Sequence, residues 1–131
     1  MAKRVALVGH CGPDSSYLRL TVSRADKDVS VIAADDEQGL QRTLREGVDL
    51  LLLNRQLDWG FEEQLGQDLV KRLRASHPGV KAMLVSNYAD AQAAAVANGA
   101  LPGFGKRDLG TPRVAQMIRE ALGAEVPQQK G

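Results

Sequence analysis

The stretch Val48-Asp49-Leu50-Leu51-Leu52-Leu53-Asn54 decides the fold of this chain, because four consecutive leucines lead to a single polar side chain. A short apolar run without polar alternation is typical of a strand buried on both faces of a parallel sheet. We therefore predict a strand over Leu50–Leu53 that ends at Asn54. Four further runs of the same kind predict strands at Arg4–Val8, Val29–Ala33, Ala82–Val85 and Leu101–Phe104.

Helical patterns alternate with these strands, and start and stop signals delimit them. The first helix follows Gly12-Pro13-Asp14-Ser15, the second covers 36–46, and the third ends before His77. The fourth is an alanine-rich segment over 89–98, and the fifth begins at Thr111-Pro112. The apolar faces expected for the first, third and fifth helices are, in that order, Tyr17, Leu18, Thr21 and Val22; Phe61, Leu65, Leu69, Val70 and Leu73; and Val114, Met117, Ile118 and Leu122.

The alternation of five strands with five helices predicts an α/β fold. Right-handed crossovers between parallel strands place helices on both faces of the sheet. A chain of 131 residues suits one domain, which we expect over 1–126, followed by a polar tail over 127–131. In an open sheet of this kind, functional side chains gather where the strands end. The side chains expected at that edge are those of Gly9-His10-Cys11, Asn54-Arg55-Gln56, Ser86-Asn87-Tyr88 and Gly105-Lys106-Arg107.

Composition excludes several classes of function. The 17 basic and 16 acidic residues leave a net charge of +1, which argues against nucleic-acid binding by this domain. Cys11 is the only cysteine, so no disulfide can form within the chain, and a reducing compartment is expected. The apolar run after the N-terminus is too short for a secretory signal or a membrane span. We expect a cytoplasmic protein that does not bind membranes.

The chain resembles the receiver domains of two-component response regulators over residues 3–124. The resemblance is carried by Asp49–Asn54, and by the alanine-rich helix that leads through Asn98-Gly99-Ala100 to a strand followed by Lys106. It implies a flavodoxin-like (CheY-like) fold with three layers, α/β/α, and a five-stranded parallel sheet with five helices. It also implies a role in phosphorelay signalling and no cofactor.

The resemblance assigns roles to residues at the strand ends. In the family, an acidic pair and a phosphoacceptor Asp bind Mg²⁺, while a Ser or Thr and a Lys contact the phosphoryl oxygens. Ser86 and Lys106 match the last two positions. Gly9 and His10 occupy the acidic-pair positions, and Asn54 occupies the phosphoacceptor position.

Two further departures follow the fifth strand. The aromatic residue that the family carries two or three positions before the Lys falls on Gly103, next to Phe104, and Arg107 replaces the frequent Pro after the Lys.

The departures at the strand ends remove the groups that phosphorylation of a receiver domain requires. Mg²⁺ prefers carboxylate and other hard oxygen ligands, and Gly9, His10 and Asn54 supply no carboxylate. An amide nitrogen is also no acceptor for a phosphoryl group, whereas a carboxylate is. We therefore expect a non-phosphorylatable pseudo-receiver that is not an enzyme and acts through protein–protein contacts.

Alternatives remain for the same residues. Lys106 is expected to bond the amide oxygen of Asn54 as a structural remnant, or else to form an anion or metabolite site with Ser86, Arg55 and His10. A zinc site would need about four ligands, and the nearby His10 and Cys11 with Asp14 do not supply them, so no metal is expected. The chain could also be a receiver module of a larger regulator.

The resemblance implies a partner surface, formed by the fourth helix, fifth strand and fifth helix, that could serve a signalling protein or a second copy of the chain. The residues expected on it are Gln92, Ala95, Arg107, Arg113, Gln116 and Arg119. Trp59, in the loop after the third strand, is a second candidate anchor if it is exposed.

Overall fold

The computed structural model describes residues 3–57 and 60–123. The five strands are β1 (Arg4–Val8), β2 (Ser30–Ala34), β3 (Leu50–Asn54), β4 (Ala82–Val85) and β5 (Leu101–Phe104). The five α-helices are α1 (Gly12–Ala25), α2 (Glu37–Glu46), α3 (Gly66–Ser76), α4 (Ala89–Ala97) and α5 (Pro112–Ala121), and a one-turn 3₁₀ helix, η1, covers Lys106–Asp108. Within the described residues, no helix is long and apolar enough to cross a membrane.

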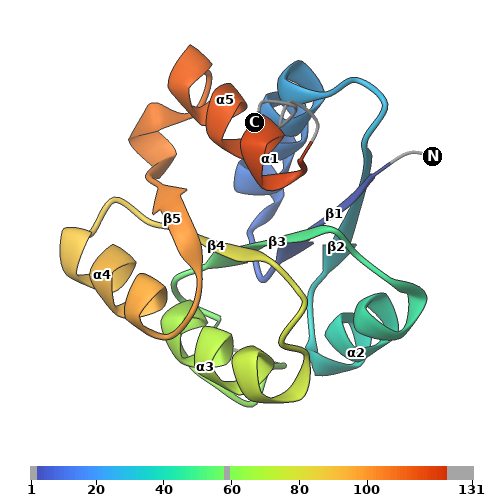
Figure 1. The fold of residues 1–131 in the computed structure, drawn as a ribbon, viewed down its shortest axis with the longest axis vertical. Helices are drawn as coiled ribbons and strands as arrows, with labels where there is room; N and C mark the ends of the chain where they lie inside the picture. The colour runs from blue at the N-terminus through green and yellow to red at the C-terminus, as the bar shows by residue number, and fades with distance from the viewer. Residues whose placement is uncertain (1–2, 58–59, 124–131) are drawn as a thin grey trace, which may run out of the picture.

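All neighbouring strands are parallel, in the order β2-β1-β3-β4-β5. Figure 1 shows α1 and α5 on one face of the sheet and α2, α3 and α4 on the other. The predicted three-layer α/β/α architecture of the flavodoxin-like type is therefore confirmed.

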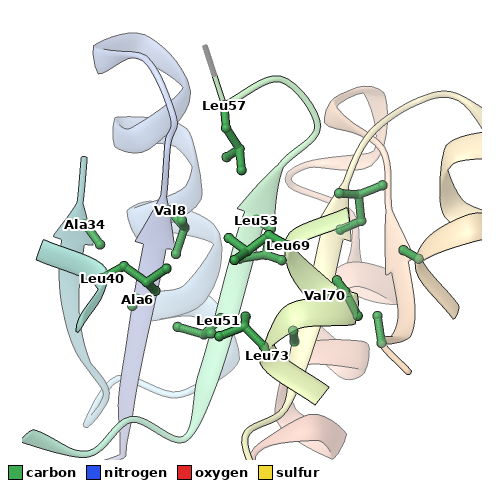
Figure 2. Packing of buried hydrophobic residues seen from close by; sticks show 14 of the residues in the cluster. Ala6, Val8, Ala34, Leu40, Leu51, Leu53, Leu57, Leu69, Val70 and Leu73 are labelled. Atoms are coloured by element: carbon green, nitrogen blue, oxygen red, sulfur yellow. The ribbon is translucent and has the colours of Figure 1, made fainter. Parts of the chain in front are cut away.

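The leucine run of β3 forms the centre of the core. Leu51 and Leu53 pack with Leu69 on the side of α2, α3 and α4, as Figure 2 shows. Leu50 and Leu52 point to the opposite side and pack with residues of α1 and α5. All four are completely buried, which explains why the run has no polar alternation.

The structure differs from prediction in several element boundaries and in one exposed side chain. β2 begins and ends one residue later than expected, at Ser30 and Ala34. α3 begins at Gly66, so Phe61 and Leu65 precede the helix, although Phe61 still packs against the core. In α1, Tyr17 is 64% exposed, so its place on the apolar face was wrong.

The fifth helix follows its prediction closely. Thr111 caps it by accepting a hydrogen bond from the Val114 backbone N–H, and Pro112 occupies its first turn. Ile118 is buried, as expected, whereas Met117 is only partly buried.

The last strand contains a β-bulge. Met83 pairs with Leu101 and Val85 pairs with Phe104, so three steps along β5 match two steps along β4. The extra residue brings Leu101 and Phe104 to the same face of the sheet, where Phe104 is buried against α1 and α5. Phe104 is therefore a core residue, and no aromatic side chain takes the place of Gly103.

The connection from β3 to α3 is stabilised by a short antiparallel backbone bridge and by ion pairs. Gln56 pairs with Leu65 across an antiparallel bridge. Arg72 of α3 donates two hydrogen bonds to Glu63, at 2.6 and 2.8 Å, and two to Glu37 of α2, at 2.8 and 2.9 Å. This ion-pair cluster joins the connection to two helices.

The half-buried cluster favours ionised carboxylates. Burial opposes ionisation of Glu37, but hydrogen bonds from Arg72 and Gln41 outweigh that effect and hold the pKa of Glu37 below its usual value. The hydrogen bonds that Arg72 donates to Glu63 and Glu37 raise the pKa of Arg72, which stays charged.

Close packing of α3 under the strand edge requires a glycine. A Cβ atom at Gly66 would collide with the Asn54 carbonyl oxygen and lie 2.8 Å from a Leu84 methyl carbon. We expect Gly66→Ala to lower the free energy of unfolding by about 1–3 kcal/mol, measured by urea denaturation, because this backbone cannot move away freely. The control is Gly79→Ala, where no atom lies within 4 Å, and its effect should stay within about 0.5 kcal/mol. Equal effects of the two substitutions would contradict this packing.

Candidate functional site

The C-terminal edge of the sheet brings Asn54 beside the end of β1. Val8 pairs with Leu53, so Gly9 lies next to Asn54. The Asn54 side-chain Nδ2 donates hydrogen bonds to the Gly9 carbonyl at 3.1 Å and to the Gln56 carbonyl at 2.8 Å. Two carbonyl acceptors thus surround this position, which favours an amide and disfavours a carboxylate.

His10 turns into the protein instead of toward solvent. Its ring is only 8% exposed, and Nε2 bonds the Leu52 carbonyl at 2.8 Å, which requires a proton on Nε2. Nδ1 is buried and has no hydrogen-bond partner among the described residues. Burial lowers the pKa of His10, so the ring is neutral at pH 7.

The glycine at the other acidic-pair position leaves no room for a side chain. Gly9 has φ of +73°, a region that residues with a side chain rarely adopt. A Cβ atom there would lie 2.7 Å from a Leu57 methyl carbon. A carboxylate at this position would therefore require both backbone strain and movement of Leu57.

Lys106 is held by an acidic residue of α1. Its Nζ lies 2.7 Å from the Asp14 Oδ2 in a half-exposed ion pair. The hydrogen bond from Lys106 lowers the pKa of Asp14. The expectation that Lys106 bonds the Asn54 amide oxygen was wrong, because Asp14 offers a charged partner instead.

Ser86 is buried, and its hydroxyl oxygen accepts a hydrogen bond from the Tyr88 backbone N–H at 3.1 Å. The Arg55 guanidinium lies 4.6 Å above the centre of the Tyr88 ring. Between these groups is a shallow pocket of about 240 Å³. Its lining residues are Asn54, Arg55, Gln56, Val85, Ser86, Asn87, Tyr88 and Lys106.

This edge does not fit a magnesium ion. Gly9 has no ligand atom, the Nε2 of His10 is bonded to the backbone, and Asn54 presents a neutral amide. Asp35 lines a neighbouring groove with His10 and Cys11. Within residues 3–57 and 60–123, however, no group of three or more His, Cys, Asp or Glu side chains could hold a metal ion.

Solved receiver domains share the architecture of this chain. One similar structure is the signal receiver domain of a DNA-binding response regulator from Colwellia psychrerythraea 34H, with a TM-score of 0.72, 16% identity, and coverage of 92% of this chain and 98% of that one. The chain has the receiver fold. The beryllofluoride-activated NtrC4 receiver domain dimer gives a TM-score of 0.75 at 15% identity, covering 92% of this chain and 97% of that one.

Longer proteins contain the receiver fold as well. NtrX from Brucella abortus gives a TM-score of 0.78 at 18% identity, covering 95% of this chain but 28% of that one. No protein-family model and no curated protein matches the sequence. The fold is therefore established by structure, and function must be argued from the site.

Sequence reasoning placed the main residues of this receiver-fold edge but missed two contacts. Gly9, Asn54 and Lys106 lie at the strand ends, as their positions in sequence indicated. The roles of Asp14 as the partner of Lys106 and of Leu57 as the neighbour of Gly9 had no sequence signal, because each joins segments far apart in the chain.

The expected partner surface needs correction at two positions. Ala95 is completely buried, so it cannot take part in an exposed surface. The Gln92 amide turns inward and donates to backbone carbonyls of β4 and β5. Arg107, Arg113 and Gln116 are exposed, whereas Arg119 is half-buried and bonds the Ala25 carbonyl. Trp59 and the tail over 127–131 lie outside the described residues.

The buried His10 predicts a pH-dependent stability. The folded-state pKa is lowered from 6.5, so the unfolded chain takes up the proton first and stability falls as the pH drops below about 6.5. Between pH 7.5 and 5.5 we expect a loss of up to about 1.4 kcal/mol in urea denaturation. His10→Gln should remove this loss, whereas the control His77→Gln should retain it. An unchanged pH profile in His10→Gln would show that another group is responsible.

Proposed function

We propose that this chain is a receiver-fold module that accepts no phosphoryl group and acts in signal transduction through protein–protein contacts. The observation that carries the proposal is the Asn54 amide, which donates to the Gly9 and Gln56 carbonyls where a phosphoacceptor would lie. A nucleophilic carboxylate is missing, and the surrounding acceptors suit an amide donor. The module is therefore non-enzymatic and takes its state from partner binding, or has one permanent state.

The contacts of the retained residues support this proposal. Lys106 is neutralised by Asp14 at 2.7 Å, and the Ser86 hydroxyl already accepts a backbone hydrogen bond. A phosphoryl group would have to displace Asp14 to reach Lys106. Lys106 and Ser86 thus have structural roles within the chain that need no phosphoryl ligand.

A second candidate is a sensor of a small anion or metabolite. The pocket beside Asn54 contains Arg55 and Lys106 but no carboxylate among its lining residues, which favours an anion. The Asp14–Lys106 ion pair weakens this candidate, because it reduces the positive charge available to a ligand. The chain also suits a module of a larger regulator, as the receiver fold forms part of NtrX.

We propose the face formed by α4, β5 and α5 as the contact surface, here for a second copy of the chain. Val96 is 44% exposed on α4, and Pro102 is exposed on the edge strand β5. A groove of about 260 Å³ includes Pro102. It is lined by Met83, Leu101, Pro102, Met117, Glu120 and Ala121. The similar NtrC4 receiver domain was solved as a dimer, which supports self-association as the first test.

The Asn54→Asp substitution tests the central claim. We expect no stable Mg²⁺-dependent phosphorylation from acetyl phosphate, because Gly9 and His10 still provide no metal site. Intact-protein mass spectrometry would detect the added phosphoryl group. We also expect about 1–3 kcal/mol lower stability, since the Gly9 and Gln56 carbonyls lose their donor.

The wild-type protein supplies the matching control. Amide NMR with Mg²⁺ and beryllofluoride should show no shifts at Asn54, Ser86 and Lys106. Robust labelling of Asn54→Asp would contradict the proposal that this strand edge cannot support phosphorylation. Saturable shifts of the wild type with beryllofluoride or with inorganic phosphate alone would favour the anion sensor instead.

A charged side chain introduced on the proposed contact surface tests whether that surface mediates self-association. Val96→Glu should raise the dissociation constant of the self-association at least about tenfold in sedimentation velocity, because it places a carboxylate in an apolar contact. Leu20→Glu on α1 is the matched control, since Leu20 is 49% exposed but lies on another face, and it should leave the constant unchanged. A wild-type protein that stays monomeric, or equal effects of both substitutions, would refute self-association through this face.

A further inference from the structure

A side chain of α4 contacts the sheet beside the β-bulge of β5. Gln92 supplies a hydrogen-bond donor there. Its Nε2 lies 2.9 Å from the Leu84 carbonyl oxygen, 3.1 Å from that of Ser86 and 3.3 Å from that of Phe104. We call this group of contacts the Gln92 bridge.

The amide orientation of the bridge is determined by its surroundings. Three carbonyl oxygens lie near one nitrogen, so the oxygen of the amide must point away from them. That oxygen, Oε1, is buried without a hydrogen-bond partner among the described residues. An unpaired buried acceptor is unfavourable, so the contacts of the nitrogen must outweigh its cost.

Gly103 is the structural complement of Gln92. A Cβ atom at Gly103 would collide with the Leu84 carbonyl oxygen and lie 2.8 Å from the Gln92 Oε1. A side chain at this position would therefore displace the bridge. The contacts of the Gln92 amide therefore depend on a glycine at position 103.

A second amide secures the same connection on the side of η1. The Asn87 Oδ1 accepts a hydrogen bond from the Arg107 backbone N–H at 3.1 Å. A Cβ atom at Gly105 would collide with that same Oδ1, so this contact also depends on a glycine. Gln92 thus joins α4 to β4 and β5, and Asn87 joins the β4–α4 connection to η1.

We propose that the Gln92 bridge holds α4 and the β4–α4 connection in one position, so that the α4–β5–α5 face keeps one shape whatever contacts the strand edge. This inference deepens the proposed function, because it rests on the proposal that the α4–β5–α5 face is a contact surface. The bridge supplies the physical constraint, because any displacement of α4 would leave the Leu84 carbonyl without this donor.

Amide hydrogen exchange of the whole chain tests the proposal. Gln92→Met keeps a long, flexible side chain but removes the donor. We expect amides of residues 87–97 to exchange about tenfold faster or more, while those of α2 keep their wild-type rates. The control is Gln41→Met on α2, which removes a side-chain amide that bonds only Glu37 among the described residues, and it should leave residues 87–97 unchanged.

A second variant covers the case in which Gln92→Met does not fold. Gln92→Glu has the same shape but directs a carboxylate oxygen at the carbonyls, so it should accelerate the same amides at pH 7. Wild-type exchange over 87–97 in either folded variant, or acceleration spread evenly over the protein, would overturn the proposal. Because exchange rates do not depend on phosphoryl binding, this result is separate from the beryllofluoride titration.

Discussion

Burial of β3 on both faces is the constraint on which the rest of the structure depends. Four leucines that are completely removed from water must have helices on either side, and parallel neighbours must complete their hydrogen bonds. The parallel arrangement then brings the ends of β1, β3, β4 and β5 to one edge. Asn54, as the first polar side chain after the run, is thereby placed between the Gly9 carbonyl, which follows β1, and the Gln56 carbonyl, which follows β3.

At that edge, three of the groups that could contact a ligand are bonded to the protein itself. The Asn54 amide is bonded to backbone, His10 is turned inward, and Lys106 is paired with Asp14. Each of these contacts would have to break, or be shared, before its side chain could bind a ligand. On the α4–β5–α5 face, the Gln92 amide is likewise bonded within the protein, since it donates to backbone carbonyls of β4 and β5.

The sequence was sufficient for the architecture and for the location of the site, since both depend on local patterns. The buried run of β3 and the cap of α5 at Thr111 are signals carried by neighbouring residues. The errors concern contacts between distant segments. Tyr17 fits a helical stripe but faces solvent, and Gln92 fits a polar surface but turns inward to the carbonyls of β4 and β5. Likewise, the pairing of Lys106 with Asp14 depends on how α1 lies beside η1, which no local pattern encodes.

The contact between Gly9 and Leu57 has a consequence for substitutions at these two positions. The Leu57 methyl group occupies the space that the first atom of any side chain at position 9 would need, and the Gly9 backbone is in a conformation that disfavours such a residue. A side chain introduced at position 9 would therefore need a compensating, smaller residue at position 57. The two positions are coupled through this contact, so the stability changes caused by substitutions at 9 and at 57 would not be additive.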